Sequence, residues 1–478
     1  MKRRRYWPAI IILACPCMLL AQSPPYQSDF PPEEFRARWD VVFDRIGDHG
    51  VAIIQGAPKP TGFLVPRQTN EFYHFCGIET PHAYLILDGR TRKASLFLPP
   101  RDARLEGAEG KVIAADDAEL VKRLTGVSAV ASTRELAGEG LQRRLGDSVA
   151  VLYTPFSPGE RNSECRDELR SANAAIASDA WDGRPSREAH FVQLLRSRFP
   201  RNEVRDLTPI LDEIRAVKSP REIAMIRRAS QLAGRGLIEA MKSSRPGVFE
   251  YQLDAVARYV FLVGGARLEG YRSITASGTD NIWNMHYYRN TAQLKDGDLV
   301  LMDFAPEYHY YTSDIARVWP VGGKYRAEQR ELLQFVLDYR NAVLTRIRPG
   351  VTPRAIRDEA KAAMGEVFRR TKFSKPIYER AAHRLVDTGG GVFSHPVGMA
   401  VHDDGRYTGG VLKPGHVFSI DPQLRVPEEH IYLRYEDVIA VTDKGYENFT
   451  GFLPSELDEI EKLVGRGGML QAFPAQSE

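Results

Sequence analysis

Two aspartates in the second half of the chain lie at or just after an apolar segment. Residues 299–302 read Leu-Val-Leu-Met and stop at Asp303, and Asp314 follows eleven residues later. A carboxylate that ends an apolar strand can lie at the floor of a cleft, where it must be paired or bound to a metal ion. Either aspartate alone is more often a turn or capping residue. The pair therefore marks a candidate site and does not define one.

Two histidines follow in the segment Ser-His-Pro-Val-Gly-Met-Ala-Val-His-Asp, residues 394–403. His395 and His402 are seven residues apart, with Gly398 between them. A glycine at this point allows close approach of the backbone to a neighbouring group. A lone histidine is more often structural. The segment therefore indicates a functional site only in combination with the other motifs of the chain.

Two further strand patterns carry charged residues. Residues 417–420 are apolar and end at Asp421, and residues 432–441 carry Arg434 and Glu436 two positions apart. Side chains alternate between the faces of a strand. A continuous strand over 432–441 would therefore put a cation beside a carboxylate on one face.

Taken in order, these motifs resemble those of the proline-specific metallopeptidases, the aminopeptidase P and prolidase group with the pita-bread fold. The order is Asp-x10-Asp, Ser-His-x-x-Gly-x-x-x-His-Asp, an acidic-Pro strand end and Arg-x-Glu-Asp. The likeness extends to Asn-Met-His-Tyr-Tyr around His286. It also reaches residues 66–73 and 96–102, which are similar to the aminopeptidase P N-terminal domain. The resemblance covers residues 30 to 455.

The resemblance implies a centre that holds two divalent metal ions. Asp303 would chelate one ion, Asp314 and Glu436 would bridge, and His395 with Asp421 would hold the other. A water between the ions would attack the scissile carbonyl. Because the set is rich in oxygen and has one imidazole, it favours Mn²⁺ or a similar hard ion.

The same resemblance implies the catalytic residues. His286 and His402 would stabilise the tetrahedral intermediate or position the substrate. Arg434 belongs to the site, and Asp421 would combine metal binding with proton transfer.

Three positions depart from the family pattern, all close to this chemistry. Asp421 stands where the family usually has glutamate, Gly391 where it usually has another histidine, and Arg425 where aminopeptidase P commonly has tyrosine. Proton transfer needs hydrogen-bond reach, which the shorter Asp421 side chain can lose. We expect altered specificity or a reduced rate.

The length of 478 residues suggests two domains. The predicted fold is an α/β N-terminal domain, residues 30–214, followed by an α+β pita-bread catalytic domain with pseudo-twofold symmetry, residues 218–455. Residues 456–478 form a C-terminal tail. Ser-Pro-Arg-Glu from Ser219 predicts a helix start with a capping box, and Arg-Pro-Gly-Val at 245–248 recurs at 348–351, before a second helix.

Within the first domain, residues 35–46 predict a helix and residues 51–54 a buried strand. Residues 83–87 and 94–98 predict a β-hairpin, because Asp88-Gly89 favours a tight turn. Regular alternation of helix and strand signals continues to about residue 210. A three-layer α/β arrangement is expected.

The N-terminus has the pattern of a signal peptide, predicted over residues 1–21. Four basic residues, 2–5, precede a short apolar run, 9–21. Cleavage after Ala21 and lipid attachment at Cys15 are the two alternatives, and both imply export to the periplasm, the medium or a membrane surface. Export would permit a disulfide between Cys76 and Cys165, although buried free thiols are the favoured interpretation.

The chain has 65 basic and 62 acidic residues, a net charge of +3. This balance does not suggest a nucleic-acid-binding protein.

The predicted function is an exported Xaa-Pro aminopeptidase that acts on peptides with proline second. A prolidase-like dipeptidase, and a weakly active or inactive pseudo-peptidase that binds peptides, are the alternatives. If the motif residues were ordinary caps and salt bridges, the protein would hold no stoichiometric metal. A homodimer or homotetramer is expected by analogy with the family.

Overall fold

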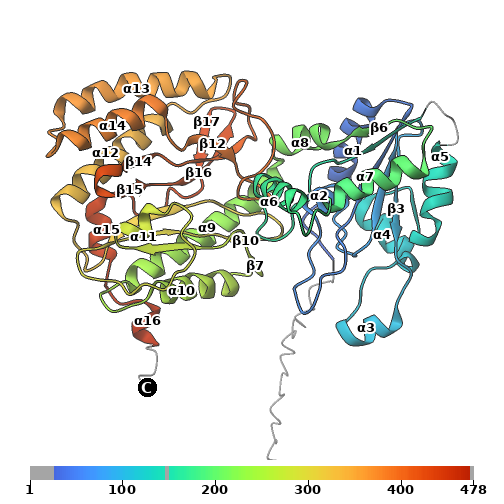
Figure 1. Cartoon of the computed structure of the whole chain (residues 1–478), viewed down its shortest axis with the longest axis horizontal. Helices are drawn as coiled ribbons and strands as arrows, with labels where there is room; N and C mark the ends of the chain where they lie inside the picture. The colour runs from blue at the N-terminus through green and yellow to red at the C-terminus, as the bar shows by residue number, and fades with distance from the viewer. Residues whose placement is uncertain (1–25, 146–149, 474–478) are drawn as a thin grey trace, which may run out of the picture.

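The structure is a computed structural model that describes residues 26–145 and 150–473. Two parts lie side by side, one built on the first half of the chain and one on the second (Figure 1). The predicted signal peptide, 1–21, and Cys15 lie outside the described residues. No helix among the described residues is long and apolar enough to span a membrane.

The first part is built on a six-stranded mixed sheet in the order β4-β3-β2-β1-β5-β6. Its strands are β1 (Gly50–Gln55), β2 (Tyr84–Asp88), β3 (Lys93–Leu98), β4 (Ala129–Ser132), β5 (Val151–Thr154) and β6 (Val204–Asp206). β1 pairs antiparallel with β2 and parallel with β5. The predicted buried strand at 51–54 is confirmed.

Helices accompany this sheet along the chain. They are α1 (Pro32–Ile46), α2 (Asn70–Cys76), α3 (Ala103–Glu109), α4 (Ala118–Thr125), α5 (Arg143–Leu145), α6 (Arg166–Ser178), α7 (Arg187–Arg198) and α8 (Thr208–Ala216). Ala52 and Ile54 pack in one apolar cluster with α1, whereas Val51 and Ile53 pack in another with Val192 of α7. Both faces of β1 are therefore covered, which explains its unbroken apolar sequence and confirms the three-layer arrangement.

The predicted β-hairpin is present, but its turn is longer than expected. β2 and β3 pair antiparallel with Asp88 opposite Lys93, so residues 89–92 form a four-residue loop. Asp88 Oδ1 accepts hydrogen bonds from the backbone N–H groups of Arg90 and Thr91. The aspartate therefore closes a wider loop through its side chain, and the expectation that Asp88-Gly89 forms a tight turn was wrong.

The second part has two antiparallel sheets enclosed by helices, which is the pita-bread arrangement. The strands are β7 (Leu268–Glu269), β8 (Ile274–Ser277), β9 (Leu299–Asp303), β10 (Pro306–Glu307), β11 (Ala316–Pro320), β12 (Val392–Pro396), β13 (Val417–Ile420), β14 (Gln423–Val426), β15 (Ile431–Arg434), β16 (Asp437–Thr442) and β17 (Gly445–Asn448). One sheet has the order β11-β9-β8 and the other β12-β13-β16-β17, with β7–β10 and β14–β15 as short pairs.

The helices of the second part repeat in two halves. They are α9 (Pro220–Ser243), α10 (Glu250–Val263), α11 (Thr279–Trp283), α12 (Ala327–Leu344), α13 (Pro353–Arg370), α14 (Pro376–Thr388), α15 (Leu457–Leu463) and α16 (Met469–Ala472). The predicted capping box opens α9, since Ser219 and Glu222 cap each other's backbone. Each Arg-Pro-Gly-Val turn leads into a helix, α10 or α13. Each half then supplies a strand, β9 or β13, that ends at an aspartate.

The segment expected to be one strand over 432–441 is two strands in different sheets. β15 pairs with β14, whereas β16 pairs with β13 and β17. Tyr435 and Glu436 lie in the break between them. The apolar pattern continues through the break because Tyr435 is fully buried, so the sequence alone gave no sign of it.

Beyond residue 455 the described chain folds back on the second part. Leu457 and Ile460 of α15 are buried in its main apolar cluster, and Gln471 of α16 donates a hydrogen bond to the carbonyl of Ser243 at the end of α9. Part of the predicted tail is thus packed against the catalytic fold.

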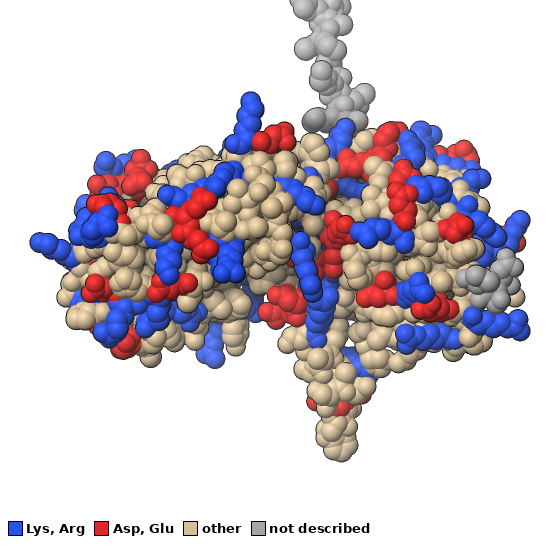
Figure 2. Space-filling view, turned by 90° about the horizontal axis from the view of Figure 1, so that it is seen from above, with Lys and Arg blue, Asp and Glu red and all other residues tan. Residues whose placement is uncertain are grey.

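Two further expectations concern charge and cysteines. Basic and acidic side chains are interspersed over the face seen in Figure 2, as the balanced composition predicts. Cys76 and Cys165 are both buried and free. The alternative of a disulfide between them is therefore not realised.

Candidate metal centre

Three of the predicted ligands converge in the second part of the molecule. Asp314, His395 and Glu436 each bring a donor atom to within 4.8 Å of the others. His395 lies on β12, Asp314 precedes β11, and Glu436 lies between β15 and β16. The distance from His395 Nε2 to Asp314 Oδ2 is 3.3 Å. Elements from both halves thus meet in one cluster with metal-ligand chemistry.

His395 is prepared to act as a neutral ligand. Its Nδ1 lies 3.1 Å from the carbonyl oxygen of Pro396. A carbonyl only accepts, so Nδ1 carries the ring proton and the lone pair of Nε2 is available to bind a cation beside Asp314. Burial and the neighbouring His402 lower the pKa of His395 to about 3, which keeps the imidazole uncharged.

The remaining two predicted ligands, Asp303 and Asp421, lie against Arg434. A guanidinium nitrogen of Arg434 contacts Asp303 Oδ2 closely. Its Nη1 lies 3.5 Å from Asp421 Oδ2 and 3.9 Å from Glu436 Oε2. Arg434 therefore joins three carboxylates, and the predicted pairing of Arg434 with Glu436 survives the break in the strand.

The centre has more buried negative groups than positive ones. Burial and the charge of Asp303 raise the pKa of Asp314 to about 7. Burial and the charge of Asp314 raise the pKa of Glu436 well above its usual range, and burial raises the pKa of Asp421. Four carboxylates surround one guanidinium, so ionisation of the full set needs additional positive charge.

Unpaired atoms test whether metal ions suit this set. Asp421 Oδ1 and Glu436 Oε2 are both buried and have no hydrogen-bond partner among the described residues. Buried carboxylate oxygens are normally paired or bound to metal. The carboxylate oxygens and the imidazole of this centre fit divalent cations. Bound cations would be partners for these two oxygens and would supply the positive charge that the four carboxylates need.

Comparisons with known proteins agree with this geometry. Residues 224–443 match metallopeptidase family M24, and residues 35–153 match the aminopeptidase P N-terminal domain. The chain is 30% identical over 459 residues to the Xaa-Pro aminopeptidase of Escherichia coli strain K12, a match that covers 91% of this chain and 98% of that protein. The chain belongs to the aminopeptidase P family of metallopeptidases.

Other members of the family are similar over most of their length. The Xaa-Pro aminopeptidase 3 of Mus musculus is 29% identical over 444 residues, covering 88% of this chain and 81% of that protein. The structure of E. coli aminopeptidase P with the inhibitor Pro-Leu matches with a TM-score of 0.71 and 28% identity, over 91% of this chain and 98% of that one. The predicted family and the predicted fold class are thereby confirmed.

Two of the departures from the aminopeptidase P pattern are in direct contact. A Cβ atom at Gly391 would overlap the carbonyl oxygen of Asp421, and Gly391 has a φ of 78°. Asp421 Oδ2 accepts a hydrogen bond of 2.5 Å from Gln423. Glycine at 391 therefore allows the backbone around 391 to pack against the end of β13, and a histidine could not occupy this conformation without strain.

Substitution of Gly391 by alanine tests this contact. Because the new Cβ collides with the Asp421 carbonyl at a positive φ, we expect a loss of stability of about 1–3 kcal/mol and a lower metal content. Thermal unfolding and elemental analysis measure the two effects. Gly365→Ala is the matched control: it lies inside α13, where the nearest atom to a new Cβ is 4.0 Å away, and should be neutral or stabilising.

The third departure, Arg425, lies beside the segment that carries His286. Its Nη2 is 3.4 Å from Met285 Sδ, and its guanidinium lies 4.5 Å from the ring centre of Tyr432 and 5.3 Å from that of Trp283. Burial and the charge of Arg434 lower the pKa of His286. The predicted cation near the cleft is therefore present, a short distance from a predicted catalytic histidine.

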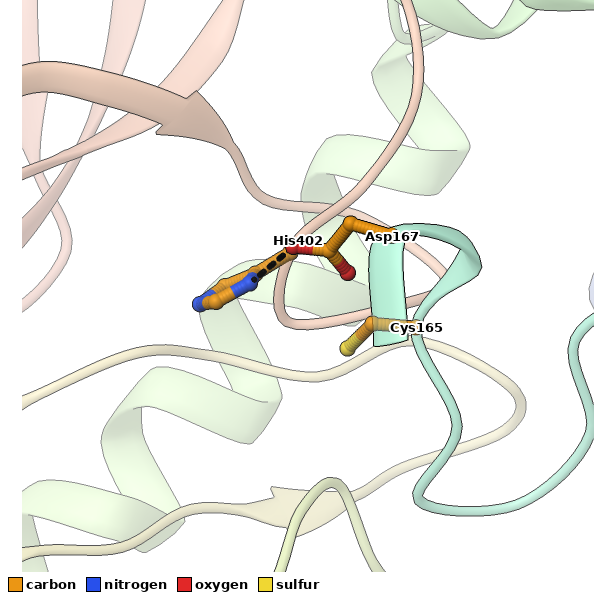
Figure 3. Close-up of side chains that lie close together, drawn as sticks. All are labelled: Cys165, Asp167 and His402. Atoms are coloured by element: carbon orange, nitrogen blue, oxygen red, sulfur yellow. Dashed lines mark hydrogen bonds and ion pairs between the residues drawn. The ribbon is translucent and has the colours of Figure 1, made fainter. Parts of the chain in front are cut away.

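His402 lies beside His395, with ring centres 4.3 Å apart. Its Nδ1 is 2.9 Å from Asp167 Oδ2 in the first turn of α6, a helix of the first part (Figure 3). Gly398 allows the loop to close here, because a Cβ at this position would overlap Asp403. The two predicted histidines thus meet at the edge of the candidate centre.

Three contacts at the centre were not predicted from the sequence. Tyr271 donates a 2.6 Å hydrogen bond to Asp303 Oδ1, Ser419 Oγ lies 3.3 Å from His395 Nε2, and Gln423 holds Asp421. Ser419 could have been found, because it lies two residues before Asp421 and faces the same side of that strand end. No motif points to Tyr271.

Proposed function

We propose that this metallopeptidase is an exported Xaa-Pro aminopeptidase that releases the N-terminal residue from peptides with proline second. The observation that carries the proposal is the convergence of Asp314, His395 and Glu436, together with one buried oxygen each of Glu436 and Asp421 that has no hydrogen-bond partner among the described residues. Relatives named Xaa-Pro aminopeptidase, similar along most of the chain, support the reaction and the peptide substrate.

Two divalent ions, most suitably Mn²⁺, are proposed as the cofactor. Asp303, Asp314, His395, Asp421 and Glu436 would hold them, because one imidazole among carboxylate oxygens suits a hard ion. Bound ions of this kind polarise a carbonyl and activate a water for hydrolysis. A zinc-substituted form of the E. coli enzyme exists in complex with product, so the metal identity needs a direct measurement.

The residues around the ligands have separate tasks in this proposal. Arg434 fixes Asp303 and Asp421 through its two terminal nitrogens. His402, held by Asp167 through Nδ1, would direct Nε2 towards bound peptide, and His286 would approach from its own segment. Hydrogen bonds from these imidazoles would stabilise negative charge that develops on the scissile carbonyl.

Export is also proposed, through the signal pattern of residues 1–21. The basic residues 2–5 and the apolar run that follows support it. Intact mass of the mature protein distinguishes the two modes of processing: cleavage after Ala21 leaves Gln22 first, whereas a lipoprotein begins at a modified Cys15. A dimer or tetramer is proposed by analogy with the family alone.

Hydrolysis by metal-reconstituted protein tests the proposed activity. We expect release of the first residue from Xaa-Pro-Xaa peptides with Mn²⁺, together with about two bound ions per chain by elemental analysis. Cleavage restricted to Xaa-Pro dipeptides would identify a prolidase. Bound metal without turnover with Mn²⁺, Co²⁺ or Zn²⁺ would identify a pseudo-peptidase, and absence of stoichiometric metal would refute the centre itself.

Lengthening of Asp421 is expected to increase the rate. Asp421→Glu restores the family's side chain and extends the carboxylate by one methylene towards the cluster, which it now meets only through Arg434. A positioned proton-transfer group contributes about 10²–10⁴-fold, so we expect kcat to rise at least tenfold. Steady-state kinetics with metal content measured in parallel provide the check. An unchanged kcat at full metal loading would mean that the shorter side chain is already compensated.

A further inference from the structure

A second cluster of metal-ligand chemistry lies where the two parts of the molecule meet. Cys165, Asp167 and His402 each bring a donor atom to within 4.8 Å of the others (Figure 3). Cys165 is the residue before α6 and Asp167 lies in its first turn, whereas His402 belongs to the loop between β12 and β13. None of the three is in the set proposed to bind the two hydrolytic ions.

We propose that Cys165, Asp167 and His402 form a third metal site, selective for Zn²⁺ or a similarly soft divalent ion. A sulfur, an imidazole nitrogen and a carboxylate oxygen are the donors that zinc accepts. The nearby centre of carboxylates and one imidazole suits harder ions. The sulfur is therefore what would make the third site chemically distinct.

The geometry needs only side-chain adjustment. Tetrahedral zinc with bonds of about 2.0 to 2.3 Å sets its donor atoms about 3.3 to 3.8 Å apart. Here His402 Nδ1 and Asp167 Oδ2 are 2.9 Å apart, and the donor atoms of all three residues lie within 4.8 Å of one another. The Asp167 and His402 side chains are 58% and 32% exposed, so they can rotate, and a water can reach the fourth position.

Proton balance follows from the groups present. Cys165 is buried, and burial raises the pKa of its thiol to about 12. Burial therefore favours the protonated thiol when no ion is bound. Binding of Zn²⁺ would displace the thiol proton to solvent, and His402 would bind through Nδ1 as a neutral imidazole with its one ring proton on Nε2. One proton is therefore released while one Zn–S, one Zn–N and one Zn–O bond form.

The position of the site gives it a consequence for catalysis, which rests on the proposed function. His402 is assigned to the substrate, and its ring lies 4.3 Å from that of His395. An ion inserted between His402 Nδ1 and Asp167 would replace their direct 2.9 Å contact and so shift the imidazole from the position in which Asp167 holds it for the bound peptide. Occupancy of the third site would therefore slow hydrolysis without removing the two hydrolytic ions.

Cobalt spectroscopy on the full chain tests the site without reference to turnover. Thiolate bound to Co²⁺ gives a near-ultraviolet charge-transfer band, which carboxylate and imidazole ligands do not produce. We expect this band in the wild-type protein and in Cys76→Ser, its loss in Cys165→Ser, and its weakening in Asp167→Asn. Cys76 is the matched control, because it is also buried and free but lies in α2.

Zinc stoichiometry provides the second measurement. After equilibrium dialysis against Zn²⁺, Cys165→Ser should hold one ion fewer than wild type and Cys76→Ser the same number. A charge-transfer band that persists in Cys165→Ser, or equal zinc content in all variants, would overturn the proposal. If Cys165→Ser fails to fold, Asp167→Asn, a change at an exposed side chain, decides on the same two readouts. A protein without peptidase activity would still show the band. The proposed function and the proposed third metal site can therefore be refuted separately.

Discussion

Asp314→Asn is expected to remove peptide hydrolysis almost completely. Asp314 is buried between His395 and Asp303, and an amide cannot supply the charge with which a carboxylate holds two cations. If the ions contribute about 4 kcal/mol to the transition state, their loss lowers kcat/KM by about 10³-fold. Kinetics of Xaa-Pro-Xaa hydrolysis and metal content measure the two losses together.

The same substitution is expected to stabilise the metal-free protein. Removal of one buried carboxylate from a group of four relieves repulsion that Arg434 only partly offsets. Higher thermal stability combined with lost metal would separate a ligand from an ordinary structural residue, whose removal lowers stability. Asp358→Asn, at an exposed position on α13, is the control and should change neither property. Full activity in Asp314→Asn would disprove the assignment of the centre.

Much of the centre could be predicted because its residues lie at the ends of regular elements. β9 is apolar until Asp303 and β13 until Asp421, and both were recognisable as buried strands that stop at a carboxylate. The start of α9 at Ser219 was equally clear, since a capping box is a local signal. Predictions of this kind succeed when neighbouring residues alone determine the conformation.

Contacts between distant segments could not be predicted in this way. In the sequence, Gly391 and Asp421 are separate departures from the family pattern, whereas in the structure Gly391 packs against the carbonyl of Asp421. Asp167 and His402 are 235 positions apart and belong to different parts of the molecule. No periodicity or turn signal records such a pairing, because it depends on how the two parts dock.

Arg215→Met is expected to give the largest loss of stability among these substitutions. Arg215 on α8 is buried and joins carboxylates from both parts of the molecule. Its Nη1 lies 3.2 Å from Glu160 Oε2 and 3.4 Å from Glu71 Oε1, and its Nη2 contacts Asp403 closely. Removal of one partner from a buried ion pair costs about 3–5 kcal/mol, because the opposite charges remain in place without compensation.

Thermal unfolding followed by circular dichroism measures this effect. A loss of this size should lower the midpoint by roughly 3 to 5 °C in a chain of this length. Arg205→Met is the control, since Arg205 pairs with Glu203 at the exposed edge of the first part and should leave the midpoint nearly unchanged. Arg215→Lys should fall between, because lysine keeps the charge but cannot reproduce the forked hydrogen bonds.

The same variant connects stability to the candidate centre. Asp403 follows His402 directly and is held from two sides, by Arg215 and by Lys218 Nζ at 3.0 Å. Loss of the arginine leaves only the lysine, so the loop that positions His402 should relax. At a temperature where the variant remains folded, we expect kcat to fall while metal content stays at the wild-type level. A drop in metal content instead would mean that the buried ion network supports the ligands themselves, and an unchanged kcat would mean that His402 is positioned without it.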